Sequence, residues 1–273
     1  MDWKLEGQTS LFDFIPNVEN PSITRGGRYN IYNEDCLEFM KKQSDCAFDI
    51  TFTSPPYNDS GNENDGCEEK GFRHRKYNHV ENRKDWFEWQ VECIKQMQRI
   101  TKKFVLYNVQ AILNNKADVY RIIGHFADEI HMILIWYKPN AQPQHYSHRI
   151  SNCYEMVIVF KGKDFNKKKF WLNTDGQRNV IVKNINADRT YSKEHRAIMS
   201  YDFAEEIIKN YTEPEDTVFD AFSGLATTGI ACVKNGRNYV GTELDKRYYE
   251  LSLERIKNSW NNIYDILQYK KRR

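Results

Sequence analysis

A hydroxyl, two prolines and an aromatic ring follow one another at Ser54-Pro55-Pro56-Tyr57. Consecutive prolines restrict φ and remove two backbone donors, so the chain should leave a preceding strand as a rigid, extended platform. The Ser54 hydroxyl and the backbone carbonyls of this platform are hydrogen-bond acceptors, and Tyr57 presents an aromatic face. Such a platform suits a planar base with an exocyclic amine. Taken alone, an ordinary proline-rich exit from a strand explains these four residues slightly better.

A second set of residues that could bind a ligand lies in the C-terminal part of the chain. Residues 221–229 form a glycine-containing turn between a predicted strand at 217–220 and a helical run at 230–234. Such a turn aims backbone N–H groups at a ligand. Glu243 follows the next predicted strand, at 238–242, about 20 residues beyond the turn, where a carboxylate can accept hydrogen bonds from two ribose hydroxyls.

The turn matches neither of the common phosphate-binding patterns. Gly224 and Gly229 have the spacing of a P-loop, but Ile230 and Ala231 stand where Lys and Ser or Thr are required. Ala226 occupies the place of the second glycine in a dinucleotide-binding pattern. A ligand with a ribose and no phosphate therefore fits this turn better.

The segments that must position these residues alternate between strands and helices. Residues 48–53 are apolar and β-branched, which predicts a buried strand leading into Ser54. Residues 85–100 are amphipathic, and Trp86 and Trp89 are expected to pack against a core. The other predicted elements are a strand–helix–strand unit at 28–57, strands at 104–107, 130–137 and 155–160, and a closing helix at 248–267. This alternation indicates an α/β, doubly wound, largely parallel sheet whose site lies at the carboxyl ends of the strands.

Composition limits the class of protein. The 273 residues allow one large α/β domain or two small ones, and an apolar content of 40% is enough for a core. The six cysteines show no C-x-x-C spacing, and neither a signal peptide nor a long apolar run is present. We therefore expect a cytoplasmic protein with reduced thiols. The net charge is only +2, so contacts with nucleic acid must rely on local basic clusters.

The order of these motifs resembles that of the β-group DNA amino-methyltransferases that use S-adenosylmethionine. In that family a Ser/Asp-Pro-Pro-Tyr motif precedes the target-recognition region, and the cofactor loop comes last. Residues 53–57 match the catalytic motif, and residues 220–228 match the Asp-Pro-Phe-x-Gly-x-Gly-Thr-Thr loop except at Ala221 and Ala226. Further similar segments are residues 33–36, 135–139 and 240–249, with a looser match at 195–200. The resemblance covers roughly residues 28–257.

The resemblance implies a doubly wound, mostly parallel, seven-stranded Rossmann-like sheet with a short target-recognition insertion. It divides the chain into an N-terminal arm at 1–27 and a methyltransferase domain at 28–273. A mobile loop at 58–82 and a recognition region at about 140–190 are expected within that domain. The implied cofactor is S-adenosylmethionine. The residues assigned to it are Asp35, Cys36, Thr53, His195, Asp220, Phe222, Ser223, Gly224, Ala226, Thr227, Thr228 and Glu243.

The catalytic residues that the resemblance implies are Ser54, Pro55, Pro56 and Tyr57. An exocyclic amine is a poor nucleophile because its lone pair is delocalised into the ring. Ser54 Oγ and the Pro55 carbonyl can accept its two N–H bonds and so localise the lone pair for attack on the sulfonium methyl group. The base must first flip out of the duplex, and Tyr57 can then stack on it.

Ser rather than Asp at position 54 bears on the target base. In the resembling family Ser-Pro-Pro-Tyr is typical of cytosine-N4 enzymes and Asp-Pro-Pro-Tyr of adenine-N6 enzymes. The sequence therefore favours cytosine N4, with adenine N6 as the alternative. The motif order differs from that of the glutamine and ribosomal-RNA methyltransferases with Asn-Pro-Pro-Tyr. A non-catalytic DNA- or cofactor-binding protein on the same scaffold is a further alternative, which the intact Ser54, Asp220 and Glu243 disfavour.

Basic and amide side chains flank the expected target groove. Residues 58–82 are polar and can close over a bound base. Cys67, His74 and His79 in this loop lack a fourth ligand and a typical zinc spacing, so we expect no metal site. The side chains expected to contact DNA are Arg73, Arg75, Lys76, Gln142, Gln144, His145, His148, Arg149 and Arg178.

The expected partner is double-stranded DNA. Residues 8–12, Gln-Thr-Ser-Leu-Phe, also resemble the Gln-x-x-Leu-Phe peptide that docks bacterial proteins on the replication sliding clamp. The apolar side chains of this arm can equally attach it to its own core. A cognate restriction enzyme and a homodimer are further partners that the sequence leaves open. We expect no membrane association, and a place near the nucleoid of a bacterial or phage-infected cell.

Overall fold

A computed structural model describes residues 27–56, 83–112, 115–141, 150–166, 178–185, 190–191 and 198–271 of the chain, without the side chains of 83–85 and 260–271. Eight of the segments in this part are strands of a single sheet, in the order β1-β8-β7-β2-β3-β5-β4-β6. Their bounds are β1 Tyr29–Tyr32, β2 Phe48–Thr53, β3 Thr101–Val109, β4 Ile130–Tyr137, β5 Tyr154–Lys161, β6 Val180–Val182, β7 Thr217–Asp220 and β8 Asn238–Thr242.

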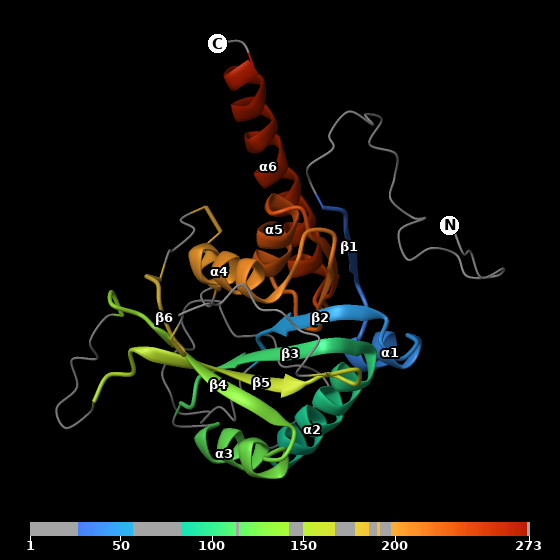
Figure 1. Cartoon of the computed structure of the whole chain (residues 1–273), viewed down its shortest axis with the longest axis vertical. Coiled ribbons are helices and arrows are strands. Elements are labelled where there is room, and N and C mark those ends of the chain that lie inside the picture. The colour runs from blue at the N-terminus through green and yellow to red at the C-terminus, as the bar shows by residue number, and fades with distance from the viewer. Residues whose placement is uncertain are drawn as a thin grey trace.

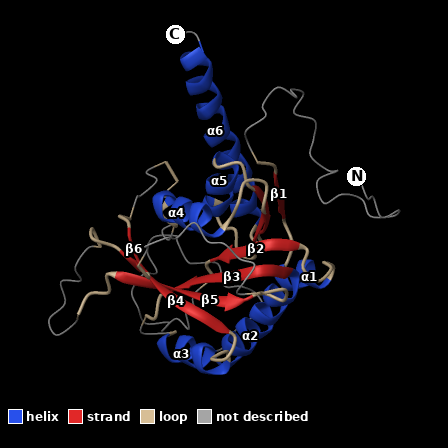
Figure 2. Ribbon diagram, in the orientation of Figure 1, coloured by secondary structure: helices blue, strands red, loops and turns tan. Residues whose placement is uncertain are grey.

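The sheet is mostly parallel. Only β5 runs antiparallel to its neighbours, β3 and β4, while every other pair is parallel. The predicted α/β, doubly wound class is therefore confirmed (Figures 1 and 2). The described sheet has one strand more than the expected seven, because the short β6 adds to its edge beside β4.

Helices cover both faces of the sheet. Their bounds are α1 Cys36–Lys41, α2 Arg83–Ile100, α3 Lys116–His125, α4 Tyr201–Tyr211, α5 Thr227–Lys234 and α6 Lys246–Lys271. Helices α1, α2 and α3 lie on one face and α4, α5 and α6 on the other (Figure 1). Each face has its own apolar cluster, in which alternate residues of the strands pack against the helices.

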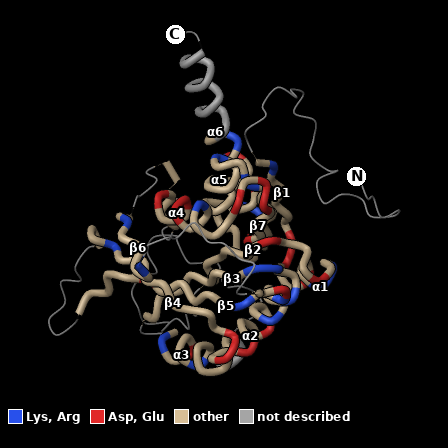
Figure 3. Tube along the Cα trace, viewed as in Figure 1, with Lys and Arg blue, Asp and Glu red and all other residues tan. Residues whose placement is uncertain are grey.

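The tryptophans of α2 pack as expected. Trp86 is 3% exposed, and Trp89 is half-buried against the same cluster. No helix in the described ranges is long and apolar enough to cross a membrane. Lys and Arg are interspersed with Asp and Glu along the described chain, as the near-neutral net charge implies (Figure 3).

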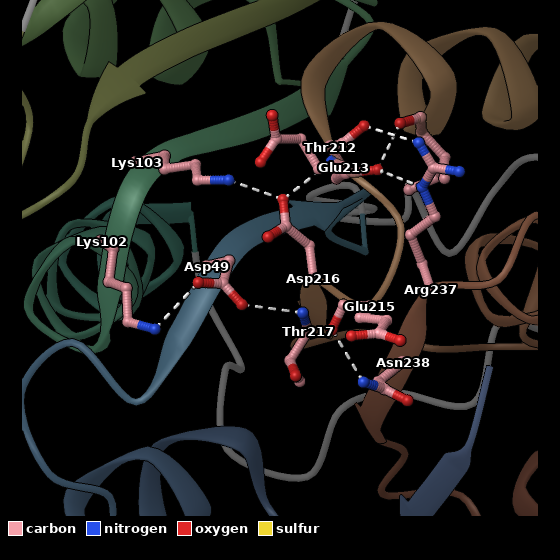
Figure 4. A network of polar contacts seen from close by, with 11 residues as sticks. Asp49, Lys102, Lys103, Thr212, Glu213, Glu215, Asp216, Thr217, Arg237 and Asn238 are labelled. Atoms are coloured by element: carbon pink, nitrogen blue, oxygen red, sulfur yellow. Dashed lines mark hydrogen bonds and ion pairs between the residues drawn. The ribbon is translucent and has the colours of Figure 1, made fainter. Parts of the chain in front are cut away.

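Polar contacts tie the amino ends of the central strands together (Figure 4). Asp49 of β2 accepts hydrogen bonds from Lys102 Nζ of β3, at 2.8 Å, and from the Thr217 backbone N–H of β7, at 2.9 Å. Asp216 pairs with Lys103 Nζ at 2.6 Å. These contacts set the register of β2, β3 and β7 from one end, and the loops at the other end of the sheet are left to form the site.

Candidate active site

Three adjacent strands, β8, β7 and β2, end side by side at the carboxyl edge of the sheet. Each is followed by residues singled out in the sequence. Ser54 follows β2, the turn at 221–226 follows β7, and Glu243 follows β8. Because ligands of open α/β sheets bind at this edge, the fold brings both predicted halves of the site together.

Thr53 and Asp220 join the catalytic strand to the cofactor loop. Thr53 Oγ1 donates to Asp220 Oδ1 at 2.6 Å, and the Phe222 backbone N–H lies 3.2 Å from both oxygens. The Tyr239 hydroxyl donates to the second Asp220 oxygen at 3.3 Å. Asp220 is 3% exposed. Burial raises its pKa to about 6, although these hydrogen bonds act in the opposite direction.

The cofactor loop contains two residues in the left-handed region, Gly224 at φ 51° and Ala226 at φ 54°. Ala226 precedes α5, and its methyl group is fully buried in the cluster beneath α4 and α5. This side chain therefore points into the core and takes no space from a ligand on the loop. The loop is held by the Ser223 N–H, which donates to the Thr242 carbonyl at 2.9 Å.

Arg255 of α6 supports the start of α5 and was not singled out in the sequence. Its Nη1 donates to the Leu225 carbonyl and to Thr227 Oγ1, both at 2.8 Å. Thr228, the next residue, hydrogen-bonds Asp220. All three threonines assigned to the cofactor, Thr53, Thr227 and Thr228, therefore have partners within the protein. Arg255 had no local signal, because its role depends on α6 packing beside a loop 30 residues earlier.

Glu243 closes the other side of the loop. Its two carboxylate oxygens accept the backbone N–H groups of Gly224 and Asp245, both at 2.9 Å. The Asn33 side chain donates to the Glu243 carbonyl at 2.8 Å, which joins the end of β1 to the end of β8. Glu243 is 4% exposed, and burial raises its pKa to about 7. A carboxylate has about four acceptor sites, so two backbone donors leave capacity for hydroxyl groups of a ligand.

Asp35 and Cys36 lie beside Glu243 at the end of β1 but have local roles. Asp35 Oδ1 caps α1 by accepting the N–H groups of Leu37 and Glu38, at 2.9 and 3.1 Å. The Cys36 side chain is 5% exposed and packs in the core cluster of α1 and α2. The Cys36 thiol is therefore part of the core in this structure.

Helix α2 supports the proline platform at residues 54–56. Trp86 Nε1 donates to the Pro56 carbonyl at 3.0 Å, and the Trp89 ring meets Phe222 edge-on with centroids 5.6 Å apart. Pro55 is buried and Ser54 half-buried. One helix therefore contacts both the platform and the cofactor loop. The amphipathic pattern of α2 predicted buried tryptophans, but it could not indicate which loop they contact.

Buried polar residues at the ends of β3, β4 and β5 form a chain that the sequence did not single out. Asn108 Nδ2 donates to Glu155 Oε2 at 2.6 Å, and Lys138 Nζ pairs with Glu155 Oε1 at 2.9 Å. Asn108 is 2% exposed and Lys138 6%. Lys138 belongs to the segment at 135–139 that resembles the family, and this resemblance was the only signal for any of the three.

Several predicted site residues lie outside the described residues. Arg178, which is described, is exposed just before β6 at the edge of the sheet. The predicted site residues that lie outside the described part of the chain are Tyr57, Arg73, Arg75, Lys76, Gln142, Gln144, His145, His148, Arg149 and His195, together with the clamp-like segment 8–12.

Comparison with known proteins identifies the family of the chain. Residues 48–254 match the N6_N4_Mtase family model, described as DNA methylase. The chain is 27% identical over 247 residues to the Type II methyltransferase M2.MboI of Moraxella bovis, which covers 83% of this chain and 87% of that protein. It is 25% identical over 265 residues to M.HinfI of Haemophilus influenzae, covering 86% and 70%.

Solved structures agree on the fold. The PvuII DNA methyltransferase, titled cytosine-N4-specific, matches with a TM-score of 0.64 at 18% identity, covering 88% of this chain and 94% of that one. A complex of M1.HpyAVI with S-adenosylmethionine matches with a TM-score of 0.61 at 20% identity, covering 84% and 98%. At these identities the structural matches establish the fold alone.

Proposed function

This chain belongs to the N6/N4 family of DNA methylases, which use S-adenosylmethionine, and we propose that it methylates the N4 amine of a flipped cytosine in DNA. The observation that carries this proposal is the contact between Thr53 and Asp220, at 2.6 Å. It joins the residue before Ser54 to the first residue of the cofactor loop. An amine acceptor and a methyl-donor loop are thereby held at one edge of the sheet.

The residues of the loop fit a ribose-bearing ligand. Glu243 follows β8, and its carboxylate is held by two backbone N–H groups. Gly224 beside it has the left-handed backbone that lets a loop approach a ligand closely. The buried Ala226 methyl leaves this approach open. When bound, S-adenosylmethionine supplies a methyl group on a sulfonium centre.

The platform prepares the amine. Ser54 Oγ and the Pro55 carbonyl accept the two N–H bonds, which draws the nitrogen toward tetrahedral geometry and frees its lone pair. Trp86 keeps the next carbonyl, that of Pro56, bound to α2, so the two prolines hold one conformation. Tyr57 stacks on the flipped base and offsets part of the cost of unstacking it, about a few kcal/mol. The methylated ammonium product is acidic enough to release its proton to solvent.

Ser54 supports cytosine over adenine, because the family resemblance places Ser in the cytosine-N4 group. The Type II relatives also support a role beside a restriction enzyme that cuts the same sequence. Digestion of genomic DNA by that enzyme in cells with and without this chain would test the pairing.

The deciding experiment is methyl transfer to DNA followed by mass spectrometry of the digested nucleosides. We expect N4-methylcytosine as the product. Ser54→Ala should lower turnover far more than it lowers cofactor affinity. N6-methyladenine as the sole product would replace the proposed base by adenine, and full activity of the Ser54→Ala variant would remove the role of Ser54.

A further inference from the structure

The buried chain of Lys138, Glu155 and Asn108 has a direction. An ionised carboxylate only accepts hydrogen bonds, so Asn108 must turn its NH2 group toward Glu155, as the contact of 2.6 Å shows. Lys138 holds the other carboxylate oxygen at 2.9 Å and fixes the acid in place. The Asn108 carbonyl oxygen, Oδ1, is consequently presented on the side away from Glu155.

Asn108 Oδ1 is buried and has no hydrogen-bond partner among the described residues. A buried acceptor without a partner costs about 1–3 kcal/mol, so such groups in native proteins call for an explanation. Here the neighbouring ion pair fixes the orientation of the Asn108 amide, and this orientation leaves the carbonyl oxygen without a donor at a cost in free energy. The arrangement therefore points to a donor that turns toward Asn108 Oδ1 when the site is in use.

The strand register places this acceptor next to Ser54. Thr53 of β2 pairs with Tyr107 of β3 in parallel register, so one further step along both strands sets Ser54 beside Asn108. Phe52 and Leu106, two residues earlier on each strand, belong to the same apolar cluster. Because side chains alternate along extended strands, Ser54 and Asn108 share that face of the sheet.

We propose that Asn108 is a positioning residue that accepts the hydroxyl proton of Ser54 while Ser54 Oγ accepts a hydrogen bond from the target amine. The inference rests on the proposed function and goes beyond it. An ionised carboxylate at position 54 would carry no proton, whereas the serine hydroxyl carries one that needs an acceptor. With its proton directed at Asn108, Ser54 turns a lone pair toward the amine. Lys138, Glu155, Asn108, Ser54 and the amine then form one oriented series of hydrogen bonds, which strengthens its members.

A double-mutant cycle tests this coupling by single-turnover methyl transfer to DNA. Loss of one hydrogen bond of about 1–3 kcal/mol corresponds to roughly 5- to 160-fold in rate, which is the decrease expected for Asn108→Ala. Affinities for S-adenosylmethionine and DNA should stay unchanged. In a Ser54→Ala background the same substitution should change the residual rate by less than about twofold, because the partner is already gone.

Asn210→Ala is a matched control. Asn210 is also buried and donates to a carboxylate, that of Glu206, but it lies on α4. This variant should keep the wild-type rate. Glu155→Gln is a second variant of unchanged shape. If the new glutamine keeps its oxygen on Lys138, its NH2 group faces Asn108. The Asn108 amide must then turn its oxygen toward that glutamine and its NH2 group toward Ser54, where it can no longer accept the hydroxyl proton. The rate of methyl transfer should therefore fall in the wild-type background and not in the Ser54→Ala background.

An equal loss from Asn108→Ala in both backgrounds would overturn the coupling, as would a fully active Asn108→Ala variant. A wild-type chain that transfers no methyl group to any DNA would instead remove the proposed function, and this inference with it. The two failures are therefore distinguishable.

Discussion

At the scale of single residues, the site depends on carboxylates that the fold has buried. Glu243 was predicted from its position after a strand and Asp220 from the family resemblance, and both lie at the carboxyl edge of the sheet. Burial raises the pKa of each, to about 6 and about 7. Asp220 faces Thr53 and Tyr239 within the protein, whereas Glu243 has acceptor capacity for a ligand. We therefore propose different roles for these two acids, a structural contact for Asp220 and a ligand contact for Glu243.

The pKa of Glu243 predicts a pH dependence of ribose binding. Hydroxyl groups that donate to a carboxylate favour its ionised form, so binding lowers a pKa that is about 7 in the free protein. Affinity should therefore rise with pH up to about 7 and level off above it, by roughly tenfold or more from about pH 5.5 to about pH 8. Adenosine is a suitable probe in calorimetry, because it has the ribose and does not titrate in this range.

Glu243→Gln is the control for this measurement. It should bind adenosine weakly and with a flatter pH profile, and any remaining slope belongs to Asp220. Equal affinity of the wild-type chain at about pH 5.5 and about pH 8 would contradict the assignment of Glu243 to the ribose.

At the scale of elements, each predicted motif is held by a helix or strand that the motif itself does not contain. Helix α2 was predicted from its amphipathic pattern, and its two tryptophans reach Pro56 and Phe222. Helix α4 was not predicted, although Phe203, Ala204, Ile207 and Ile208 recur on one face and are fully buried. Its periodic signal lies directly after residues 195–200, which were interpreted through a family motif instead. The three-residue strand β6 is too short for a periodic signal.

Trp86→Phe tests the support of the platform by α2. The substitution keeps an aromatic ring but removes the N–H that binds the Pro56 carbonyl at 3.0 Å. We expect turnover to fall about tenfold, with a stability loss of about 1 kcal/mol and unchanged cofactor affinity. Trp136→Phe is the matched control, because Trp136 is equally buried and donates to the Lys183 carbonyl at 2.9 Å. Equal effects of the two variants on turnover would show that the contact with Pro56 has no special role.

The Ala226→Gly substitution, at the start of α5, tests how much the left-handed backbone of Ala226 lowers the stability of the protein. Ala226→Gly relieves a backbone strain of roughly 1–2 kcal/mol but loses a buried methyl group worth about 1 kcal/mol. The free energy of unfolding should therefore change by less than about 1 kcal/mol. Ala231→Gly, equally buried within α5, loses its methyl group and helix propensity without any relief, so it should cost about 2 kcal/mol. Chemical denaturation of both variants measures the difference, and equal losses would show that the alanine is unstrained.

At the scale of the whole molecule, the sheet separates stability from chemistry. The amino edge holds the ion pairs of Asp49 and Asp216 (Figure 4). The carboxyl edge holds Ser54, Asp220 and Glu243. A β-strand is stiff enough to transmit register from one edge to the other. Contacts at the amino edge therefore set which residues of β2, β3 and β7 meet in the site.

Asp49→Ala should lower stability without impairing chemistry. It removes the partner of Lys102 and leaves the Thr217 N–H without its acceptor, which should cost about 1–3 kcal/mol of unfolding free energy. The turnover of the folded enzyme should stay within about twofold of wild type. Glu38→Ala is the control, because its pair with Lys41 lies on the surface, where solvent screens it, and the variant should keep the stability of the wild type. If the fully folded Asp49→Ala variant lost much of its turnover, the amino edge of the sheet would contribute to the chemistry at the carboxyl edge.

The sequence by itself determined the strands that precede the site, the order of its motifs, the family and the cofactor. These follow from local patterns, since the runs at 48–53, 217–220 and 238–242 encode strands through neighbouring residues alone. Tertiary structure alone decided which side chains meet. Thr53 lies 167 residues from Asp220, Trp86 lies 30 from Pro56, and Asn108 lies 47 from Glu155. Such contacts depend on the strand order β7-β2-β3-β5 and on register, which no local propensity contains, because each is a property of the whole sheet.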